Sequence, residues 1–467
     1  IPLRLVGSEM CIRDRYDMNS MQLLPYKQQV SSLLRLGLPI VVGQLGMIIL
    51  GLADTIMIGH HSTEELAAAA FVNNVFNLAI IFATGFSYGL TPLIGMLQGG
   101  GNTQGIGRVF RNALAANASV AVLLTAVMYT VYCFVDKLGQ PEELLPHIRP
   151  YFVLQLISLL FIMLFNGFRQ FAEGLTDTRT PMWILLGGNA LNIFGNYLLI
   201  YGSFGFPEWG LFGAGVSTLV SRIVMLLVFI GVVAVARRYK VYREAILRSR
   251  FNRNDFMQLN ALGWPIALQM GMETAAFSLS AIMVGWLGSI PLAAHQIMIS
   301  VSTIGFMVYY GMGAALAVRV SHFMGQKDFP NLRRAVNSGM GIILSLAIVA
   351  SLFFYLARTP IIYSFTEDHE VMVVVSSLIF SLIVYQFGDA LQITFANALR
   401  GTTDVKPMMW IAFFSYFIVA LPVGYLCGFT WGGGVVGVWV AFPAGLFTAG
   451  FLFWLRFRYR LQQLMKK

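Results

Sequence analysis

Apolar residues along this chain gather in long runs that are separated by short polar segments. Hydrophobic residues make up 57% of the 467 positions and charged residues only 11%. Runs of about 20 apolar residues can cross a ~30 Å hydrocarbon core as helices. Period-2 alternation, which would indicate a transmembrane barrel, is absent. The pattern predicts an all-α polytopic membrane protein with twelve transmembrane helices, at about residues 33–58, 66–97, 111–134, 147–170, 181–202, 211–237, 259–286, 292–324, 335–357, 370–398, 407–428 and 434–457.

The segments between these runs carry their charges asymmetrically. If the N-terminus is cytoplasmic, 24 Lys and Arg residues fall in cytoplasmic segments or at their borders, Arg169 and Arg400 among them, and only 3 fall outside. Positively charged loops remain in the cytoplasm. The distribution predicts a cell inner-membrane protein with both termini cytoplasmic. The net charge of +10 therefore reflects the membrane topology. Cations dispersed over many loops do not indicate a nucleic-acid partner.

The second half of the sequence repeats the first at an offset of 226. Residues 36–40, LGLPI, match 262–266, LGWPI, and residues 56–59, IMIG, match 282–285, IMVG. Six crossings return the chain to its starting side, so both halves insert in the same orientation and are related by a pseudo-twofold axis along the membrane normal. We expect an N-terminal lobe at 18–236, a cytoplasmic linker at 237–255 and a C-terminal lobe at 256–467, with a substrate cleft between the lobes.

The stretch at positions 1–17, IPLRLVGSEMCIRDRYD, differs in character from the rest of the chain. It lacks the apolar core of a signal peptide and resembles a translated cloning adapter. We therefore expect a non-native leader at 1–17 and a natural start at Met18.

The charged residues inside the apolar runs are not repeated between the halves. At the offset of 226, Asp54 falls on a serine, and Glu273 and Asp389 each fall on a methionine. A charge at membrane depth costs roughly 3 kcal/mol on insertion scales, so such residues usually face a polar interior. Residues needed only for folding tend to recur in both copies, which makes these three carboxylates the stronger functional candidates.

Three residues of the C-terminal half are candidates for a cation site. Glu273 lies near the middle of its span, and burial disfavours the charged form of a carboxyl group. It therefore suits either proton exchange or, if it stays ionised, cation binding. Asp389 follows Tyr385 by four residues, which places the carboxylate and the phenol on one helix face. Glu273, Asp389 and Tyr385 together offer oxygen ligands for a Na⁺ ion; the alternative is a polar cluster that only ties helices together.

A second candidate group lies in the N-terminal half. Asp54 is near the end of the first span, and Asn189, Asn192 and Asn196 form an i, i+3, i+7 stripe on the fifth. A carboxylate with amide oxygens suits a hard cation, and the amide N–H groups also suit a protonatable acid. Asparagine stripes also hold membrane helices together, so the three asparagines are either site residues or packing residues.

Other polar residues have plainer interpretations. Glu173, at the end of the fourth span, is expected to be a solvated or ion-paired loop acid, and His295 to be structural. Arg222, alone inside the sixth span, needs a partner that the sequence does not identify. The sequence contains no HExxH, GxSxG or P-loop motif, so an enzyme, an ATP-driven pump and a bound cofactor are not indicated.

With these residues in view, the chain resembles the multidrug and toxic compound extrusion (MATE) family, in particular its NorM-like bacterial branch. The resemblance rests on LADTIMIG at 52–59, Pro265-Ile266 with Glu273, LAAHQ at 292–296, and ALRG at 398–401, and it extends from Met18 to the C-terminus. It implies a V-shaped twelve-helix carrier that expels cationic or aromatic drugs in exchange for Na⁺ or H⁺. By the same resemblance, the family's cation site corresponds to Glu273, Asp389 and Tyr385, and its acidic site to Asp54, Asn192 and Asn196.

The resulting hypothesis is a multidrug efflux antiporter that works by alternating access and functions as a monomer in the lipid bilayer. If an ion or proton neutralises one of the carboxylates, the cavity loses affinity for a cationic drug. Such competition couples the two movements. A flippase for lipid-linked oligosaccharides is the alternative, although its cleft is expected to hold more cations to meet pyrophosphate, and only Arg222 is placed well inside a span.

Overall fold

The structure is a computed structural model and describes residues 23–466. Within this range it contains helices and no strand, and twelve helical segments are long and apolar enough to cross a membrane. The all-α fold with twelve transmembrane helices is thus confirmed. The predicted leader at 1–17 lies outside the described residues.

The helices of the first half run from α2 to α8. Their bounds are α2 Tyr26–His61, α3 Thr63–Ser87, α4 Leu90–Gly99, α5 Thr103–Cys133, α6 Leu145–Gly174, α7 Arg179–Ile200 and α8 Gly210–Val235, with 3₁₀ turns η1 Val135–Lys137, η2 Glu142–Leu144 and η3 Ser203–Gly205. A 3₁₀ turn η4, Arg237–Tyr239, and a short helix α9, Lys240–Arg248, lead to the second half.

The helices of the second half run from α10 to α18. Their bounds are α10 Arg253–Gly285, α11 Ser289–Gln326, α12 Phe329–Leu356, α13 Arg358–Phe365, α14 His369–Gly401, α15 Lys406–Phe413, α16 Leu421–Tyr425, α17 Gly434–Trp439 and α18 Ala441–Met465. Two π-helical segments, η5 Phe414–Ala420 and η6 Leu426–Thr430, flank α16 within the eleventh membrane segment.

Two predicted spans are less regular than their hydropathy indicates. The second divides into α3 and α4 at Tyr88 and Gly89, and the eleventh contains the π-helical segments. Pro92 and Pro422 each lack an N–H group, and each ring clashes with the carbonyl group four residues earlier. That residue is Tyr88 for Pro92 and Ile418, inside η5, for Pro422. Proline therefore accounts for the division of the second span and for the first π-helical segment, η5, of the eleventh.

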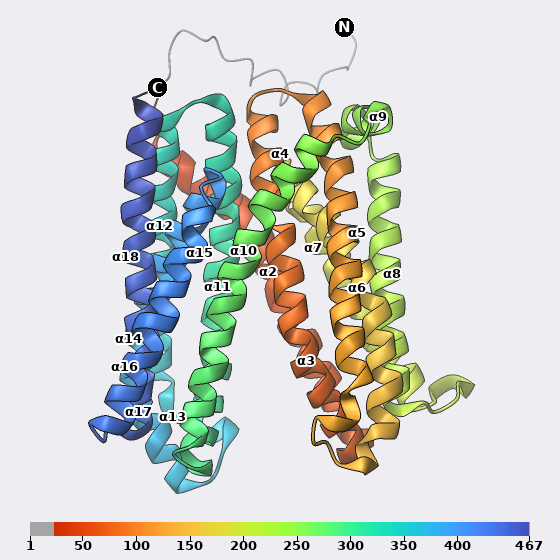
Figure 1. Ribbon diagram of the computed structural model, residues 1–467, viewed down its shortest axis with the longest axis vertical. Helices are drawn as coiled ribbons and strands as arrows, with labels where there is room; N and C mark the ends of the chain where they lie inside the picture. The colour runs from red at the N-terminus through yellow and green to blue at the C-terminus, as the bar shows by residue number, and fades with distance from the viewer. Residues whose placement is uncertain (1–22, 467) are drawn as a thin grey trace, which may run out of the picture.

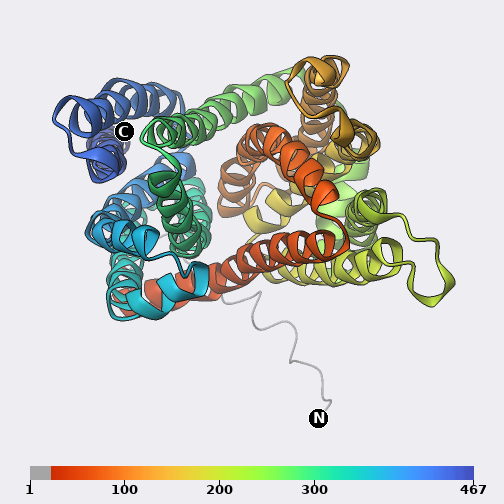
Figure 2. The same ribbon diagram turned by 90° about the horizontal axis from the view of Figure 1, so that it is seen from below.

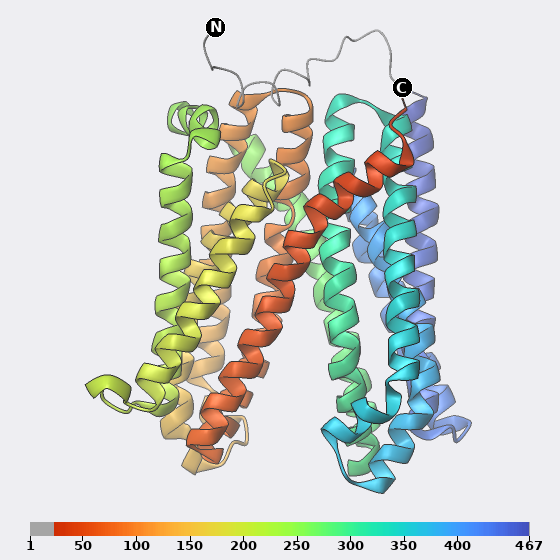
Figure 3. The same cartoon turned by 180° about the vertical axis from the view of Figure 1, so that it is seen from behind.

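The helices form two bundles that stand side by side (Figures 1 and 2). We call the end where the described chain begins and ends the terminal face, and the opposite end the distal face. Two helices lean from one bundle to the other: α2 starts beside α11 and α12 and then packs on α7, while α10 starts beside α5 and α3 and then packs on α15 (Figures 1 and 3). The first helix of each half therefore joins both bundles.

Close helix packing joins the two bundles near the terminal face. Helix α4 of the first half lies against α11 of the second, and glycine faces backbone or a small side chain at each contact. A Cβ atom on Gly95 would lie 3.0 Å from the Cβ of Ser321, and one on Gly99 would overlap the carbonyl group of His322. Gly325 is similarly placed against the carbonyl group of Met96. Only glycine permits this approach of the two backbones.

The segment between the halves is folded onto the terminal face. The Tyr239 hydroxyl donates a 2.6 Å hydrogen bond to Oδ2 of Asp177, and Arg238 pairs with the same carboxylate at 3.1 Å. Burial, followed by the hydrogen bond to Asp177, raises the pKa of Tyr239 above its ordinary value. These contacts attach the segment to the start of α7.

Candidate functional site

A cavity of about 420 Å³ lies between the two bundles. Helices α2, α3, α10, α11 and α14 supply its walls, so both halves contribute. Aliphatic, methionine and aromatic side chains make up about half of the lining residues, and amide, hydroxyl and charged groups make up the rest. The residues that the following paragraphs use are Gln269, Glu273, Tyr385, Gln392, Arg400, Tyr88 and Tyr310.

Glu273 presents its carboxylate to this cavity from α10. Its Oε2 accepts hydrogen bonds from Nε2 of Gln269 at 2.9 Å and from Nε2 of Gln392 at 3.2 Å. Gln269 is held in turn by Arg400, whose Nη2 donates to Oε1 of Gln269 at 2.7 Å. A chain of three polar side chains, Glu273, Gln269 and Arg400, therefore runs from the carboxylate to a guanidinium group on α14.

Arg400 continues this chain to the other half of the molecule. Its guanidinium carbon lies 5.8 Å from the ring centroid of Tyr88, and the Tyr88 ring lies 5.9 Å from that of Tyr310. A cation over an aromatic face is attracted by the ring quadrupole. Because Tyr88 connects α3 to α4, the polar chain that begins at Glu273 ends at the contact between the two bundles.

Asp389 is deeply buried, with 1% of its surface exposed. Neither of its carboxylate oxygens has a hydrogen-bond partner among residues 23–466. Tyr385, one turn earlier on α14, and Tyr309 on α11 lie within electrostatic range of this carboxylate, and Tyr385 is also within range of Glu273. An unpartnered buried carboxylate is costly unless it takes up a proton or a cation. The structure thus brings together Glu273, Asp389 and Tyr385.

Asp54 belongs to a separate polar network within the first bundle. The Asn196 side chain donates to Oδ1 of Asp54 at 2.6 Å. With its amide oriented so that the oxygen accepts from Thr218, Asn192 also donates to Oδ1 of Asp54, at 3.0 Å. Asn192 and Asn196 therefore contact the carboxylate directly. These three residues are not among those that line the central cavity.

The structure supplies the partners of Arg222 that the sequence left open. Its Nη1 donates to Oε1 of Gln155 at 3.1 Å and to the hydroxyl of Ser158, both on α6. Arg222 also lies close enough to Asp54 for direct electrostatic attraction. The N-terminal network thus joins an acid, a cation and amides from α2, α6, α7 and α8.

Two other predicted residues lie outside both groups. The amide nitrogen of Asn189 has no partner among the described residues and faces Gly46 of α2. His295 is buried among aromatic side chains, with its ring centroid 5.7 Å from that of Trp439. Its Nδ1 has no hydrogen-bond partner within residues 23–466.

One sequence-based expectation about charges near the terminal face was wrong in part. Glu173 is ion-paired as expected, with Arg169 at 2.7 Å, but both side chains are buried in α6 and not in a loop. Arg400 lies at the end of α14, as expected of a border residue, but it is 6% exposed and lines the cavity. The contact between the bundles near the terminal face covers the ends of these helices, which linear hydropathy does not register.

Gln269, Gln392 and Arg400 were missed as candidate site residues. Glutamine carries no charge, and Arg400 was interpreted as a border cation. The internal repeat contains a signal that would have found two of them, since at the offset of 226 Gln269 falls on Gly43 and Arg400 on Gly174. Unmatched polar residues of any kind, and not carboxylates alone, therefore mark this site.

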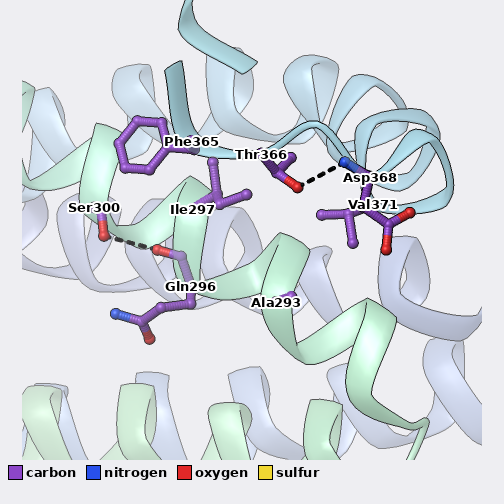
Figure 4. A pocket seen from close by; sticks show the side chains of 8 residues that line it. All are labelled: Ala293, Gln296, Ile297, Ser300, Phe365, Thr366, Asp368 and Val371. Carbon is purple, nitrogen blue, oxygen red and sulfur yellow. Dashed lines mark hydrogen bonds between the residues drawn. The ribbon is translucent and has the colours of Figure 1, made fainter. Parts of the chain in front are cut away.

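A smaller hollow of about 340 Å³ lies at the distal end of the second bundle. Figure 4 shows Ile297 and Phe365 on its walls, beside the short segment that precedes α14. In that segment the backbone N–H of Asp368 donates to the Thr366 hydroxyl at 3.1 Å. No predicted site residue lines this hollow, so it is separate from the central cavity.

A profile of the MatE family matches residues 39–198 and 265–426, which together exceed half of the chain. The chain belongs to the multidrug and toxic compound extrusion (MATE) family. The two matched stretches begin at positions 39 and 265, which reproduces the offset of the internal repeat. MATE proteins are membrane transporters, so the prediction that this chain is not an enzyme is confirmed by its family.

Individual proteins support the same assignment. The chain is 30% identical over 448 residues to the multidrug resistance protein NorM of Photobacterium profundum, covering 93% of this chain and 96% of that protein. The predicted NorM-like relationship is thereby confirmed.

Solved structures share the fold. An outward-facing multidrug resistance MATE family transporter of the MOP superfamily superimposes with a TM-score of 0.85 at 20% identity, over 94% of this chain and 97% of that chain. The MATE transporter VcmN of Vibrio cholerae gives 0.84 at 17% identity, over 95% and 99%. This MATE protein is therefore a multi-pass membrane transporter with the family fold.

Proposed function

We propose that this MATE protein is an efflux antiporter that exports cationic or aromatic small molecules in exchange for Na⁺ or H⁺. The observation that carries the proposal is the central cavity, which combines aromatic and methionine walls with the carboxylate of Glu273. Flat apolar surfaces suit aromatic molecules, and the single acid suits a positive charge. The similarity to a multidrug resistance protein supports the same substrate class.

The coupling ion competes with the drug for negative charge. Glu273 and Asp389 lie within electrostatic range of each other, and Glu273 borders the cavity. A proton or Na⁺ bound at Glu273, Asp389 and Tyr385 removes the charge that attracts a cationic drug. By thermodynamic linkage, drug bound in the cavity weakens ion binding to the same extent. This reciprocity is what antiport requires.

Asp54, with Asn192 and Asn196, is proposed as a second coupling group. Both amides donate to its carboxylate, and Arg222 lies nearby. Protonation of Asp54 would remove an acceptor of these hydrogen bonds and change how α2, α7 and α8 pack. Because α2 leans across both bundles, such a change would reach the contact between them.

Alternating access is proposed to occur by movement of one bundle against the other. The proposed lobes are 18–236 and 256–467, joined by the linker at 237–255. The terminal face, which is closed by α4 and α11, is proposed to be cytoplasmic, because the excess of Lys and Arg lies there. The protein is proposed to act as a monomer in a bacterial inner membrane, since the cavity is built from one chain.

The test is transport of ethidium by purified protein in liposomes, with a Na⁺ gradient and a pH gradient imposed separately. We expect one of the two gradients to drive ethidium movement, which also identifies the ion. The variant Glu273→Gln should lose gradient-driven transport at unchanged folding, because it removes the charge but keeps the shape. Glu64→Gln, which changes an exposed acid on α3, is the matched control and should transport normally.

Either of two results would contradict the proposal: transport by Glu273→Gln at the rate of the unmodified protein, or no ethidium movement under either gradient. In the second case the flippase alternative is examined with a lipid-linked oligosaccharide as substrate. Arg400 is a cation in the cavity, but its bond to Gln269 directs it toward Glu273, and a pyrophosphate group would meet that acid as well.

A further inference from the structure

The short helix α9 lies across the terminal face at its outer edge. Figures 1 and 3 both show it end-on, whereas the membrane-spanning helices run upright. The preceding span, α8, ends at Val235, and α10 begins at Arg253. Both ends of α9, Lys240–Arg248, are therefore tethered a few residues from a spanning helix. Because the four residues on each side of α9 can span at most about 14 Å, α9 cannot lie far from the ends of these spanning helices.

One face of α9 packs against the protein. A Cβ atom on Gly107 of α5 would lie 2.6 Å from the backbone nitrogen of Ile246, so α5 and α9 are in backbone contact. Nη1 of Arg111 donates to the carbonyl oxygen of Ser249 at 2.5 Å. The backbone N–H of Asn252 donates to Oδ1 of Asn112 at 3.0 Å. The orientation of α9 is therefore fixed by the first bundle.

The other side of α9 carries exposed apolar side chains. Val241 is 60% exposed and Leu247 is 74% exposed, and Phe251, just beyond the helix, is 60% exposed. Soluble surfaces rarely gather large apolar side chains in this way unless they contact a partner or a membrane. Helices that lie in the membrane interface combine such apolar side chains with cations.

The cations of this segment differ in their contacts. Arg238 pairs with Asp177, and Arg243 donates to the carbonyl oxygen of Ala234, so both are engaged within the protein. Lys240, Arg248 and Arg250 are exposed and make no ion pair or hydrogen bond with any residue from 23 to 466. These three charges lie beside the exposed apolar side chains.

We propose that α9 is a membrane-interface helix whose exposed face binds acidic phospholipid headgroups, with Val241 and Leu247 in the acyl-chain boundary and Lys240, Arg248 and Arg250 on the phosphates. A lipid is favoured over a soluble acidic partner because α9 is tethered at the bilayer on both sides. Acidic headgroups supply the anionic partners that these three cationic side chains do not have within the protein. The single acid on this face, Glu244, leaves the balance positive.

The bound lipid would stabilise the start of α10. Asp255, in the first turn of α10, pairs with Arg108 of α5 at 2.5 Å. The segment from α9 to Asp255 is thus held on α5 by several contacts, and lipid would hold it from the other side. Because α10 carries Glu273, the acidic-lipid content of the leaflet would affect the equilibrium between the conformations of the transporter.

The test measures where Leu247 lies and which lipid it meets. In a background with Cys11, Cys133 and Cys427 replaced by Ala, Leu247→Cys carries an environment-sensitive fluorophore in lipid nanodiscs. The quenchers are doxyl-labelled phosphatidylglycerol and doxyl-labelled phosphatidylcholine. We expect quenching by both, and stronger quenching by phosphatidylglycerol. A label at Gln104→Cys, which is exposed at the start of α5, should show no such preference.

Charge variants separate the electrostatic part from the apolar part. Each cation near an acidic surface contributes roughly fivefold to affinity, so Lys240→Gln with Arg248→Gln and Arg250→Gln should reduce the preference by up to about a hundredfold. The apolar side chains remain, so quenching itself should persist. The matched control changes three other exposed cations, Arg333, Lys406 and Lys466, to Gln and should keep the preference for phosphatidylglycerol.

Two outcomes would overturn the proposal. An unquenched Leu247→Cys label would place this face in water, and a preference for phosphatidylglycerol that survives in the triple variant would assign it to other residues. Neither readout requires transport. Failure here is therefore distinguishable from failure of the proposed antiport.

Discussion

The chemistry of Glu273 depends on the residues that hold it. Its carboxylate accepts from two glutamine amides, and one of these, Gln269, is oriented by Arg400. The amide oxygen of Gln269 has to face the guanidinium group for its nitrogen to face Glu273. Arg400 is thus a positioning residue for the proposed ion site, and its contact with Tyr88 extends that role to the other bundle.

We predict that Arg400→Gln weakens the coupling between ion and drug. A hydrogen bond to a charged group contributes about 1.5–3 kcal/mol, so its loss should reduce the coupling between ion and drug roughly ten- to hundredfold. Ethidium should still bind, because the aromatic walls remain, but its affinity should change less between ion-free and ion-saturated conditions. Equilibrium binding followed by fluorescence measures this difference. Arg458→Gln, at the end of α18, is the control.

An equal response to the ion in Arg400→Gln and in the unmodified protein would refute this role. A merely structural role would lower protein stability and ethidium affinity together. The prediction differs, since it concerns the dependence of affinity on the ion and not affinity itself. Arg400→Lys should recover little, because a single ammonium group cannot reproduce the planar geometry of the guanidinium group.

At the scale of elements, α4 and α11 hold the two bundles together near the terminal face. Gly95, Gly99 and Gly325 let the two backbones approach where any side chain would collide. The division of the second span at Tyr88 and Gly89 turns α4 away from the axis of α3, which places it against α11. The proline that interrupts the hydropathy pattern therefore also builds this contact.

We predict that Gly99→Ala shifts the protein toward a state with an open terminal face. Overpacking costs about 1–3 kcal/mol, which corresponds to roughly five- to hundredfold in population. The measurement is the labelling rate of Thr84→Cys, a cavity residue, in inverted membrane vesicles with the other cysteines replaced. The rate should rise in Gly99→Ala. Gly341→Ala, where no atom lies within 4 Å of the new methyl group, should leave it unchanged.

Equal labelling rates in Gly99→Ala and Gly341→Ala would show that the contact does not limit access from this face. Size-exclusion chromatography measures the amount of folded protein. A fall in this amount distinguishes misfolding from opening.

For the whole molecule, α2 and α10 are the two helices that pass from one bundle to the other, on opposite sides of the molecule (Figure 2). Each crossing helix packs on both bundles, so neither bundle is free to separate entirely. We propose that the bundles rotate relative to each other about these two connecting helices, with one face closing as the other opens. Both helices contribute residues to the wall of the central cavity.

We predict opposite distance changes at the two faces. Spin labels at Leu138 and Trp431, exposed sites near the distal ends of the two halves, report one distance, and labels at Gln104 and Arg333 report the other. Addition of the coupling ion and of drug should shift the two distance distributions in opposite directions. Double electron–electron resonance measures both. Changes of the same sign at both faces would contradict alternating access by rotation.

The sequence by itself determined the class of fold and identified the carboxylates of the candidate site. A span is recognised by the length of its apolar run, which has to match the thickness of the hydrocarbon core. The twelve spans could therefore be located without knowing how they pack. The carboxylates at Asp54, Glu273 and Asp389 were identifiable for the same reason, because a charge in an apolar run is unfavourable wherever its helix lies. The repeat added the orientation of the halves.

Only the tertiary structure decided which groups contact these carboxylates. Gln392 meets Glu273 across 119 residues of sequence and Arg400 meets Gln269 across 131. Such pairs depend on how helices cross and on where glycine permits close approach, as α4 and α11 show. Hydropathy and spacing describe one helix at a time, whereas hydrogen bonds between distant helices follow from the packing of the whole bundle.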